Sequence, residues 1–377
     1  MRFSIALQMP WAAVGWGAFV VLHAHAASMT LALPALLLGL CVAGLLGQVD
    51  LARAPSALEL AIAGFGLVWL LAAVLAQVPE RALALSVPTL IAVVCAIVLP
   101  RAELSRPGLA FKASVCALTA LGLHACLAIV LQLPETHPER LVELAAIPWL
   151  VVPNDLAWLG CLWPLWWRWS RSASRPAAGL VMVLGASALL VLALLMLQSR
   201  LGILVLAVAL ALELTGRRHR RAAGFAIAAV GLALLLVSLT GKGLASGGAR
   251  LQLWQAAWAL FVANPWLGVG PHGFVTAYPE VLQGASLIDP RLTPWPHSLP
   301  LELLCSGGLL LGLASVIVFT LRLRAPAGGL PAAMGVSFLL VCLFEASALR
   351  VWFWIWCVLM LLPPPARLAP APMRRND

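Results

Sequence analysis

The feature that most constrains this chain is a series of apolar runs, each about 18–22 residues long, the length needed to cross a bilayer. We place them near 8–27, 30–48, 57–77, 84–100, 113–133, 148–167, 178–197, 200–215, 222–241, 298–321, 328–345 and 351–364. Hydrophobic residues make up 63% of the chain and charged residues 10%, a composition outside the range of soluble domains. Because lipid offers no hydrogen-bond partners to the backbone, such runs predict helices. We expect an all-α polytopic membrane protein of about 12 transmembrane helices, with residues 1–377 forming one integral membrane domain.

The basic residues are unevenly divided between the two sides that this topology defines. If the N-terminus is cytoplasmic, seven of the 24 Lys and Arg fall outside, and the rest fall inside. The seven are Arg81, Arg140, Arg200, Lys242, Arg250, Arg291 and Arg350. This asymmetry agrees with the positive-inside rule and predicts cytoplasmic N- and C-termini. It accounts for most of the net charge of +10, so we do not expect nucleic-acid binding.

The N-terminal segment and the cysteines allow other interpretations. The N-terminus is similar to a signal peptide, with Arg2, an apolar stretch and A-H-A-A-S, but we favour an uncleaved first helix. Cleavage would leave the parity of the later spans unchanged. The eight cysteines all lie in predicted spans without paired spacing, so we interpret them as packing residues and expect no metal site.

One long polar and aromatic segment, 242–297, interrupts the apolar runs and falls on the outer side. Within it Leu251, Trp254 and Trp258 recur at helical spacing, which predicts an amphipathic helix lying in the membrane interface. The sequence G-V-G-P-H-G at 268–273 predicts a tight turn at which the backbone can approach a ligand closely.

Three residues far apart in sequence reach this outer side. Arg200 lies in S-R-L-G-I-L, Arg250 lies in the outer segment, and His297 stands where that segment re-enters the membrane. Guanidinium groups suit bidentate phosphate contacts, and a histidine can exchange a proton near neutral pH. Taken singly, they also fit a helix-end arginine, a solvated loop charge and a structural histidine. Their shared side of the membrane favours a functional interpretation.

Acidic and polar residues within the apolar runs form a second group of candidates. Asn154 and Asp155 lie roughly 10 Å below the outer boundary if the sixth span is helical at 1.5 Å per residue. An intramembrane carboxylate is a functional candidate by default, and the alternative is a structural salt bridge. Glu59 and His124 raise the same question more weakly. Glu345 and Arg350 flank the last outer turn, where they could simply pair with each other.

The ordered set of motifs resembles the O-antigen ligase and O-antigen polymerase superfamily. It comprises S-R-L-G-I-L, R-x-x-x-W-x-x-A with N-P-W-L-G-V-G-P-H-G-F, P-H-S-L-P-L-E-L-L-C-S-G-G-L-L-L-G, and P-N-D-L-A in the sixth span. The resemblance implies a bacterial inner-membrane glycosyltransferase with a GT-C-type helical fold and a periplasmic active site. It implies an undecaprenyl-diphosphate-linked glycan as donor. The acceptor is lipid A–core in ligases, another lipid-linked repeat in polymerases, or a pilin hydroxyl in related protein transferases.

The resemblance also implies roles for individual residues. Arg200 and Arg250 contact the diphosphate, and His297 acts at the acceptor as general base in one inverting displacement, without metal or cofactor. Further residues could orient the base or bind sugar hydroxyls, and one of them could replace His297 as the histidine that matters. These are Asn154, Asp155, Glu302 and, as the alternative histidine, His272. The chain departs from the family at Ser298, where asparagine is frequent, and in its short outer segment, which leaves the acceptor open.

Other functions remain open at this point. An O-antigen or exopolysaccharide polymerase of the same fold would carry the same motifs. A lipid flippase or solute transporter belongs to a different class and would show inverted repeats and polar groups at the bilayer midplane. Here the polar residues gather near one face, which favours an outward-facing ligase-type enzyme.

Overall fold

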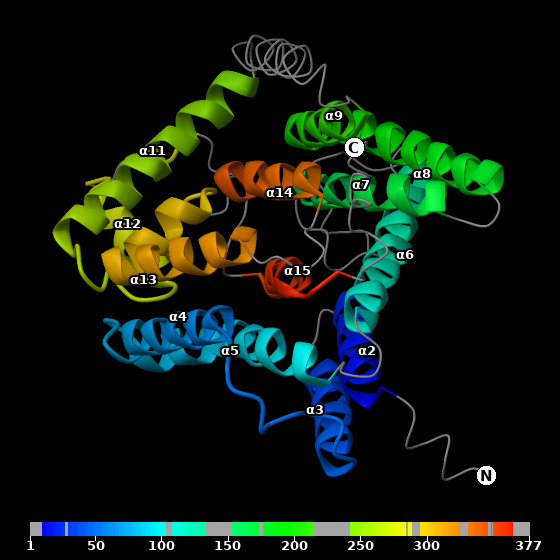
Figure 1. Cartoon of the computed structure of the whole chain (residues 1–377). Helices are drawn as coiled ribbons and strands as arrows, with labels where there is room; N and C mark the ends of the chain where they lie inside the picture. Colours follow the sequence, from blue (N-terminus) through cyan, green and yellow to red (C-terminus); the bar gives the residue numbers. More distant parts are fainter. Residues whose placement is uncertain are drawn as a thin grey trace, which may run out of the picture.

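The computed structural model describes residues 10–26, 29–102, 108–132, 153–172, 176–214, 242–283, 286–288, 295–324, 331–345, 348 and 350–364. Within these ranges the regular structure is entirely helical and contains no strand (Figure 1). Its elements are α2 (Trp11–Ala26), α3 (Met29–Leu45), α4 (Ala57–Val74), α5 (Pro79–Ala102), α6 (Leu109–Gln132), η3 (Pro153–Leu156), α7 (Ala157–Ser172), α8 (Pro176–Met196), α9 (Arg200–Leu214), α11 (Lys242–Ala263), α12 (Gly273–Val281), α13 (Leu299–Arg324), α14 (Ala332–Phe344) and α15 (Val351–Leu361).

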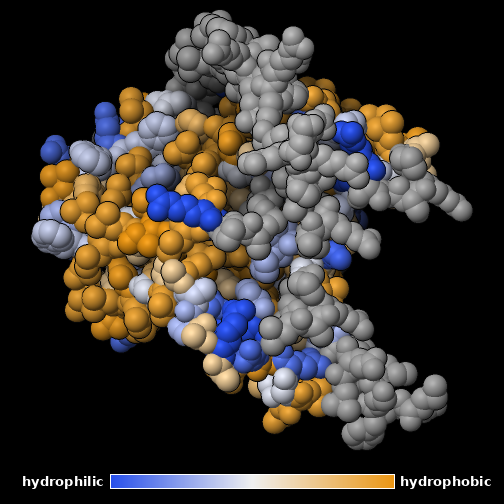
Figure 2. All heavy atoms as spheres, viewed as in Figure 1, coloured by the Kyte–Doolittle hydropathy of each residue, from blue (hydrophilic) through white to orange (hydrophobic). Residues whose placement is uncertain are grey.

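The helices have the length and surface of a polytopic membrane protein. Among the described residues, α4, α5, α6, α8 and α13 are long and apolar enough to cross a membrane, and shorter apolar helices accompany them. Large apolar side chains such as Leu38, Leu67 and Met182 lie on the outside, and Figure 2 shows a largely hydrophobic surface. The expected span at 222–241 lies outside the described residues. The other expected spans each contain a described helix.

The described part of the sixth expected span starts with a turn of 3-10 helix and not with an α-helix. Asn154 and Asp155 lie in the 3-10 helix η3, and the α-helix α7 starts only at Ala157. The depth of roughly 10 Å assumed α-helical rise throughout, so it does not apply to these two residues. They occupy a helix start, where backbone N–H groups lack intrahelical partners.

Aromatic packing around Trp158 joins three helices at the centre of the fold. The ring of Trp158 in α7 lies 5.4 Å from that of Phe338 in α14 and 5.5 Å from that of Trp356 in α15, centroid to centroid. Trp158 is fully buried. Because α7, α14 and α15 are fixed against one another here, the start of α7, the end of α14 and the start of α15 stay close together.

One ion pair and one arginine–carbonyl hydrogen bond join the helix ends that lie opposite Asn154 and Asp155. Arg168 near the end of α7 pairs with Glu213 near the end of α9, with Nε and Oε1 2.7 Å apart. Arg322 near the end of α13 donates from Nε to the Met360 carbonyl of α15 at 2.7 Å. These contacts hold the helices at the end away from Asn154 and Asp155, so both ends of this group of helices are fixed.

Glu59 also has a structural environment. Its carboxylate accepts hydrogen bonds from Arg53, from Arg101 near the end of α5, and from the backbone of Ser56, completing a capping box at the start of α4. A capping box satisfies two backbone donors that the helix itself leaves unpaired. Of the two interpretations of a carboxylate within an apolar run, the structural salt bridge therefore applies to Glu59.

Helix α13 is kinked at Gly308, where φ is 61° and ψ is −158°. The loop after α11 pairs with the backbone on both sides of this kink. The Leu309 N–H donates to the Pro265 carbonyl at 2.8 Å, and the Val269 N–H donates to the Cys305 carbonyl at 2.7 Å. A Cβ added to Gly268 would stand 2.3 Å from the Cys305 carbonyl oxygen. The tight turn expected at 268–273 thus brings its backbone close to α13 and supports the half of α13 that follows His297.

Replacing Gly308 with Ala is expected to destabilise the protein. The added Cβ would stand 2.2 Å from the Trp266 carbonyl carbon, in a backbone conformation essentially reserved for glycine. We expect a loss of at least about 1–3 kcal/mol in the free energy of unfolding, measured by thermal unfolding in detergent. Gly335→Ala in α14, where an added Cβ meets nothing within 4 Å, is the control and should be neutral or stabilising. Equal stability of the two variants would contradict the role of the kink.

Helix α11 begins at Lys242, ahead of the expected start at Arg250, and it carries apolar residues on both its buried and its exposed face. Leu253 and Ala257 are buried and belong to the cluster that packs against α12 and α13. The opposite face carries Leu251 and Trp258, each 54% exposed. The aromatic face expected at the membrane interface is therefore the face turned outward.

Candidate active site

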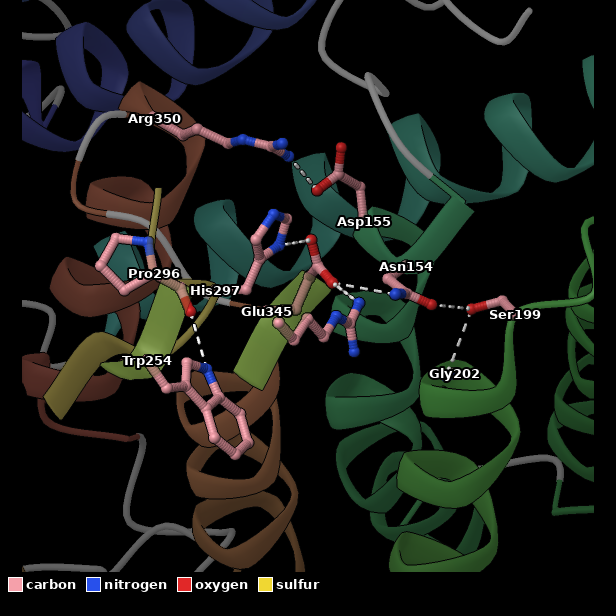
Figure 3. A network of polar contacts seen from close by, with 10 residues as sticks. Asn154, Asp155, Ser199, Gly202, Trp254, Pro296, His297, Glu345 and Arg350 are labelled. Carbon is pink, nitrogen blue, oxygen red and sulfur yellow. Dashed lines mark hydrogen bonds and ion pairs between the residues drawn. The ribbon is translucent and has the colours of Figure 1, made fainter. Parts of the chain in front are cut away.

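A buried carboxylate, Glu345, joins three segments at the common end of these helices. One residue past the end of α14, its Oε2 accepts hydrogen bonds from Arg250 at 3.0 Å and from the Asn154 amide at 2.9 Å. Its Oε1 lies 3.2 Å from Nδ1 of His297 (Figure 3). A buried carboxylate is costly unless it is paired and hydrogen-bonded, and both oxygens of Glu345 meet that condition.

The partners of Glu345 stabilise its charged form. Arg250 supplies the opposite charge at 3.0 Å, and the Asn154 amide donates a hydrogen bond to the same carboxylate. A carboxylate at this place favours the proton of neutral His297 on Nδ1, because Nδ1–H can then donate to Oε1. The other ring nitrogen, Nε2, is thereby left as an acceptor.

His297 is held in an unfavourable backbone conformation. Its φ is +50°, a region that non-glycine residues rarely adopt, and its side chain is buried. The preceding carbonyl, of Pro296, accepts a hydrogen bond of 2.8 Å from the indole of Trp254 in α11. Such strain costs about 1–3 kcal/mol and is concentrated at functional sites, where the surrounding structure imposes it.

A second ion pair lies beside His297. Arg350, at the start of α15, pairs with Asp155 of η3, and its guanidinium carbon stands 4.6 Å from the centroid of the Trp295 ring. The Trp295 ring lies 4.8 Å from the His297 ring. Figure 3 shows His297 between Glu345 on one side and the Arg350–Asp155 pair on the other. We expected Glu345 and Arg350 to pair with each other. In the structure, Arg350 pairs with Asp155, and Glu345 pairs with Arg250 and His297.

Arg200 reaches this region through the start of α9. Ser199 donates from Oγ to the Asn154 side-chain oxygen at 3.1 Å and accepts from the Gly202 N–H at 3.3 Å, as an N-cap residue does. Arg200 is the first residue of α9 and its side chain is half-buried. The chain Ser199–Asn154–Glu345 connects the start of α9 to Arg250 and His297.

Two of the sequence candidates have other surroundings. Glu302 is buried in the first turn of α13, and both of its oxygens accept from the backbone N–H of Ala348, at 3.2 and 3.1 Å. His272 precedes α12, and its Nε2 lies 3.2 Å from the Leu85 carbonyl of α5. Glu345 is thus a carboxylate hydrogen-bonded to His297, which the sequence did not single out for this contact.

The environment of His272 predicts a pH effect on stability. Burial and the charge of Arg81 lower the pKa of His272 to about 4, although the hydrogen bond to Leu85 opposes this. The unfolded chain, with the ordinary histidine pKa near 6.5, then binds more protons between about pH 4 and 6.5, so folding stability falls as pH falls through this window. His272→Asn, which also tolerates the positive φ at this position, should weaken this pH dependence, measured as unfolding temperature against pH. If unfolding temperature depends on pH equally in His272→Asn and wild type, His272 is not the source of the pH dependence.

The sequence did not identify several members of this network. Glu345 and Arg350 were recognised only as flanks of a turn, and Trp295 and Ser199 were not singled out. A signal for Glu345 existed, since an acidic residue ending an apolar run is costly and marks a functional candidate. Its partners could not be read from the sequence, because they come from residues 48, 95 and 191 positions away.

Comparison with known families agrees with the motifs. The family model of O-antigen ligase matches residues 185–316. The matched segment includes Arg200, Arg250 and His297, and it ends before Glu345 and Arg350. No curated protein matches the chain. The resemblance inferred from the motifs is thus confirmed over residues 185–316, which are similar to the O-antigen ligase family.

Proposed function

We propose that the protein is a glycosyltransferase that moves a glycan from undecaprenyl diphosphate to an acceptor hydroxyl, most simply as an O-antigen ligase acting on lipid A–core. The O-antigen ligase match over residues 185–316 supports the reaction class. We also propose the GT-C-type fold, the full set of about 12 spans, and the bacterial inner membrane with a periplasmic active site. The gathering of Arg200, Arg250 and His297 at one end of the helices supports a single outer site.

The observation that carries the proposal is the His297–Glu345 hydrogen bond. With Nδ1–H donated to Glu345, Nε2 can take the proton of the attacking sugar hydroxyl, and the carboxylate stabilises the imidazolium that forms. A base oriented by a carboxylate is the arrangement that nucleophile activation requires. Because His297 is buried, the residues that cover it must move when substrates enter.

The arginines would act on the leaving group. As the glycosidic bond breaks, negative charge grows on the lipid diphosphate, and preorganised guanidinium donors stabilise it. Arg250 already lies at the network, 3.0 Å from Glu345, and Arg200 begins α9 beside Ser199. In a single displacement, the acceptor oxygen forms the new bond to the anomeric carbon while the diphosphate departs, so the anomeric configuration inverts. We propose that this chemistry needs no metal.

A transfer assay tests the proposed function. The purified full-length protein would be given a synthetic polyprenyl-diphosphate glycan together with lipid A–core, a second lipid-linked repeat, or a hydroxyl-bearing peptide, with EDTA present. Transfer to lipid A–core with inversion supports a ligase, and extension of the lipid-linked repeat supports a polymerase instead. Loss of activity on adding EDTA, restored by a divalent metal, would refute metal independence. No transfer to any acceptor would favour the transporter class.

A further inference from the structure

Two buried nitrogen donors of this network have no hydrogen-bond partner among the residues that the structure describes. They are Nε1 of Trp295 and Nε of Arg250. A buried donor left unsatisfied costs about 1–3 kcal/mol, so native structures rarely retain one without a reason. Both atoms can only donate, and neither can accept. A ligand that satisfied them would have to present acceptor oxygens.

The position of Trp295 is fixed by its neighbours. Its ring is 6% exposed and contacts both the His297 ring, at 4.8 Å between centroids, and the Arg350 guanidinium, at 4.6 Å. The next residue, Pro296, is held through its carbonyl by Trp254. The indole is therefore packed and oriented, while its one polar group is unused.

The two N–H donors suit an ionised acceptor. Arg250 and Arg350 both lie at the network, and the buried carboxylates Glu345 and Asp155 balance their charges. Hydrogen bonds in which the donor or the acceptor is ionised are stronger than those between neutral groups. An ionised phosphate oxygen would therefore bind each of these two N–H groups more strongly than a neutral sugar hydroxyl would.

We propose that Trp295 is a donor-binding residue: its indole N–H donates to a phosphate oxygen of the lipid diphosphate. This inference rests on the proposed function and deepens it, since it adds a neutral, aromatic contact to the arginines. It places the diphosphate next to the His297 ring, where the anomeric carbon must meet the acceptor hydroxyl.

The test compares Trp295→Phe with wild-type full-length protein in phosphatidylcholine nanodiscs. Phenylalanine keeps an aromatic ring against His297 and Arg350 but lacks the N–H. Binding of polyprenyl diphosphate without a glycan should weaken roughly 10–100-fold, the range expected for a lost hydrogen bond to a charged group. The KM for the donor should rise similarly in the transfer assay. Trp258→Phe, on the exposed face of α11, is the matched control and should bind like wild type.

Each outcome decides the proposal. If wild type binds the lipid diphosphate and Trp295→Phe binds equally well, the inference is wrong. A fall in kcat with unchanged binding would also overturn it, because the indole would then act only on the position of His297. If wild type does not bind, or if phosphatidylglycerol nanodiscs abolish binding by occupying the site, the assigned ligand is wrong. Weakened binding in Trp295→Phe without any transfer by wild type would support the inference and refute the proposed reaction.

Discussion

Replacing His297 with Asn is expected to lower kcat for glycan transfer by about 10²–10⁴-fold, the usual contribution of a general base. Asparagine is the informative substitution because His297 has a φ of +50°, a conformation that asparagine tolerates better than alanine. The variant should therefore keep the backbone of the loop before α13 while removing the proton acceptor. The measurement is single-turnover transfer from a polyprenyl-diphosphate glycan, with thermal unfolding to verify the fold.

His272→Asn is the matched control for this experiment. His272 also has a positive φ, of 64°, but it contacts the Leu85 carbonyl of α5 and not Glu345. We expect its transfer rate to stay close to that of wild type. If His272→Asn is inactive and His297→Asn remains active, the assignment is reversed and His272 is the base. Full activity in both variants would exclude both His297 and His272 as the base.

Replacing Glu345 with Gln is expected to reduce kcat by about 10²–10⁴-fold, although the substituted residue is nearly the same size. A glutamine can turn its NH₂ toward Nδ1 of His297, which moves the ring proton to Nε2 and leaves that nitrogen unable to accept the hydroxyl proton. It also removes the negative charge that would stabilise the imidazolium. We expect a smaller rise in the KM for the donor, because Glu345 also holds Arg250, the proposed diphosphate contact.

A stability measurement separates this effect from unfolding. Glu345→Gln also removes the partner charge of Arg250, and breaking a buried ion pair costs about 3–5 kcal/mol. We therefore expect a lower unfolding temperature in the variant, yet a cooperative transition above the assay temperature. Glu213→Gln, which removes the carboxylate paired with Arg168 at the opposite helix ends, is the control and should retain kcat. Similar losses of kcat in both variants would mean that Glu345 acts only on stability.

The sequence specified the class of fold through a strong physical signal. Apolar runs of bilayer length must be helical, and each expected span outside 222–241 contains a helix. Boundaries were less well determined where local structure competes with the apolar pattern. The sixth span illustrates this, since η3 and not an α-helix carries Asn154 and Asp155. Helix α11 also extends earlier than its amphipathic stretch, because small residues from Lys242 onward can continue a helix without contributing to the pattern.

The candidate site was predicted in part. The motifs named Arg250, His297 and Asn154, and the structure brings all three to one carboxylate. They did not name that carboxylate, and Glu302, the nearer candidate in sequence, binds the backbone of Ala348 instead. A glutamate five residues from His297 is favoured by sequence distance alone, whereas hydrogen bonding depends on direction as well as distance.

The sequence by itself determined that the chain is helical, apolar on its surface, and similar over residues 185–316 to the O-antigen ligases, because hydrophobic run length and ordered motifs are local properties. Only the tertiary structure decided which charges are paired. Glu345 and Arg350 lie five residues apart, yet each bonds across the fold, to His297 and Arg250 in one case and to Asp155 in the other. Packing around Trp158 fixes the helix ends that carry these groups, and buried charges then take the partners whose geometry satisfies them.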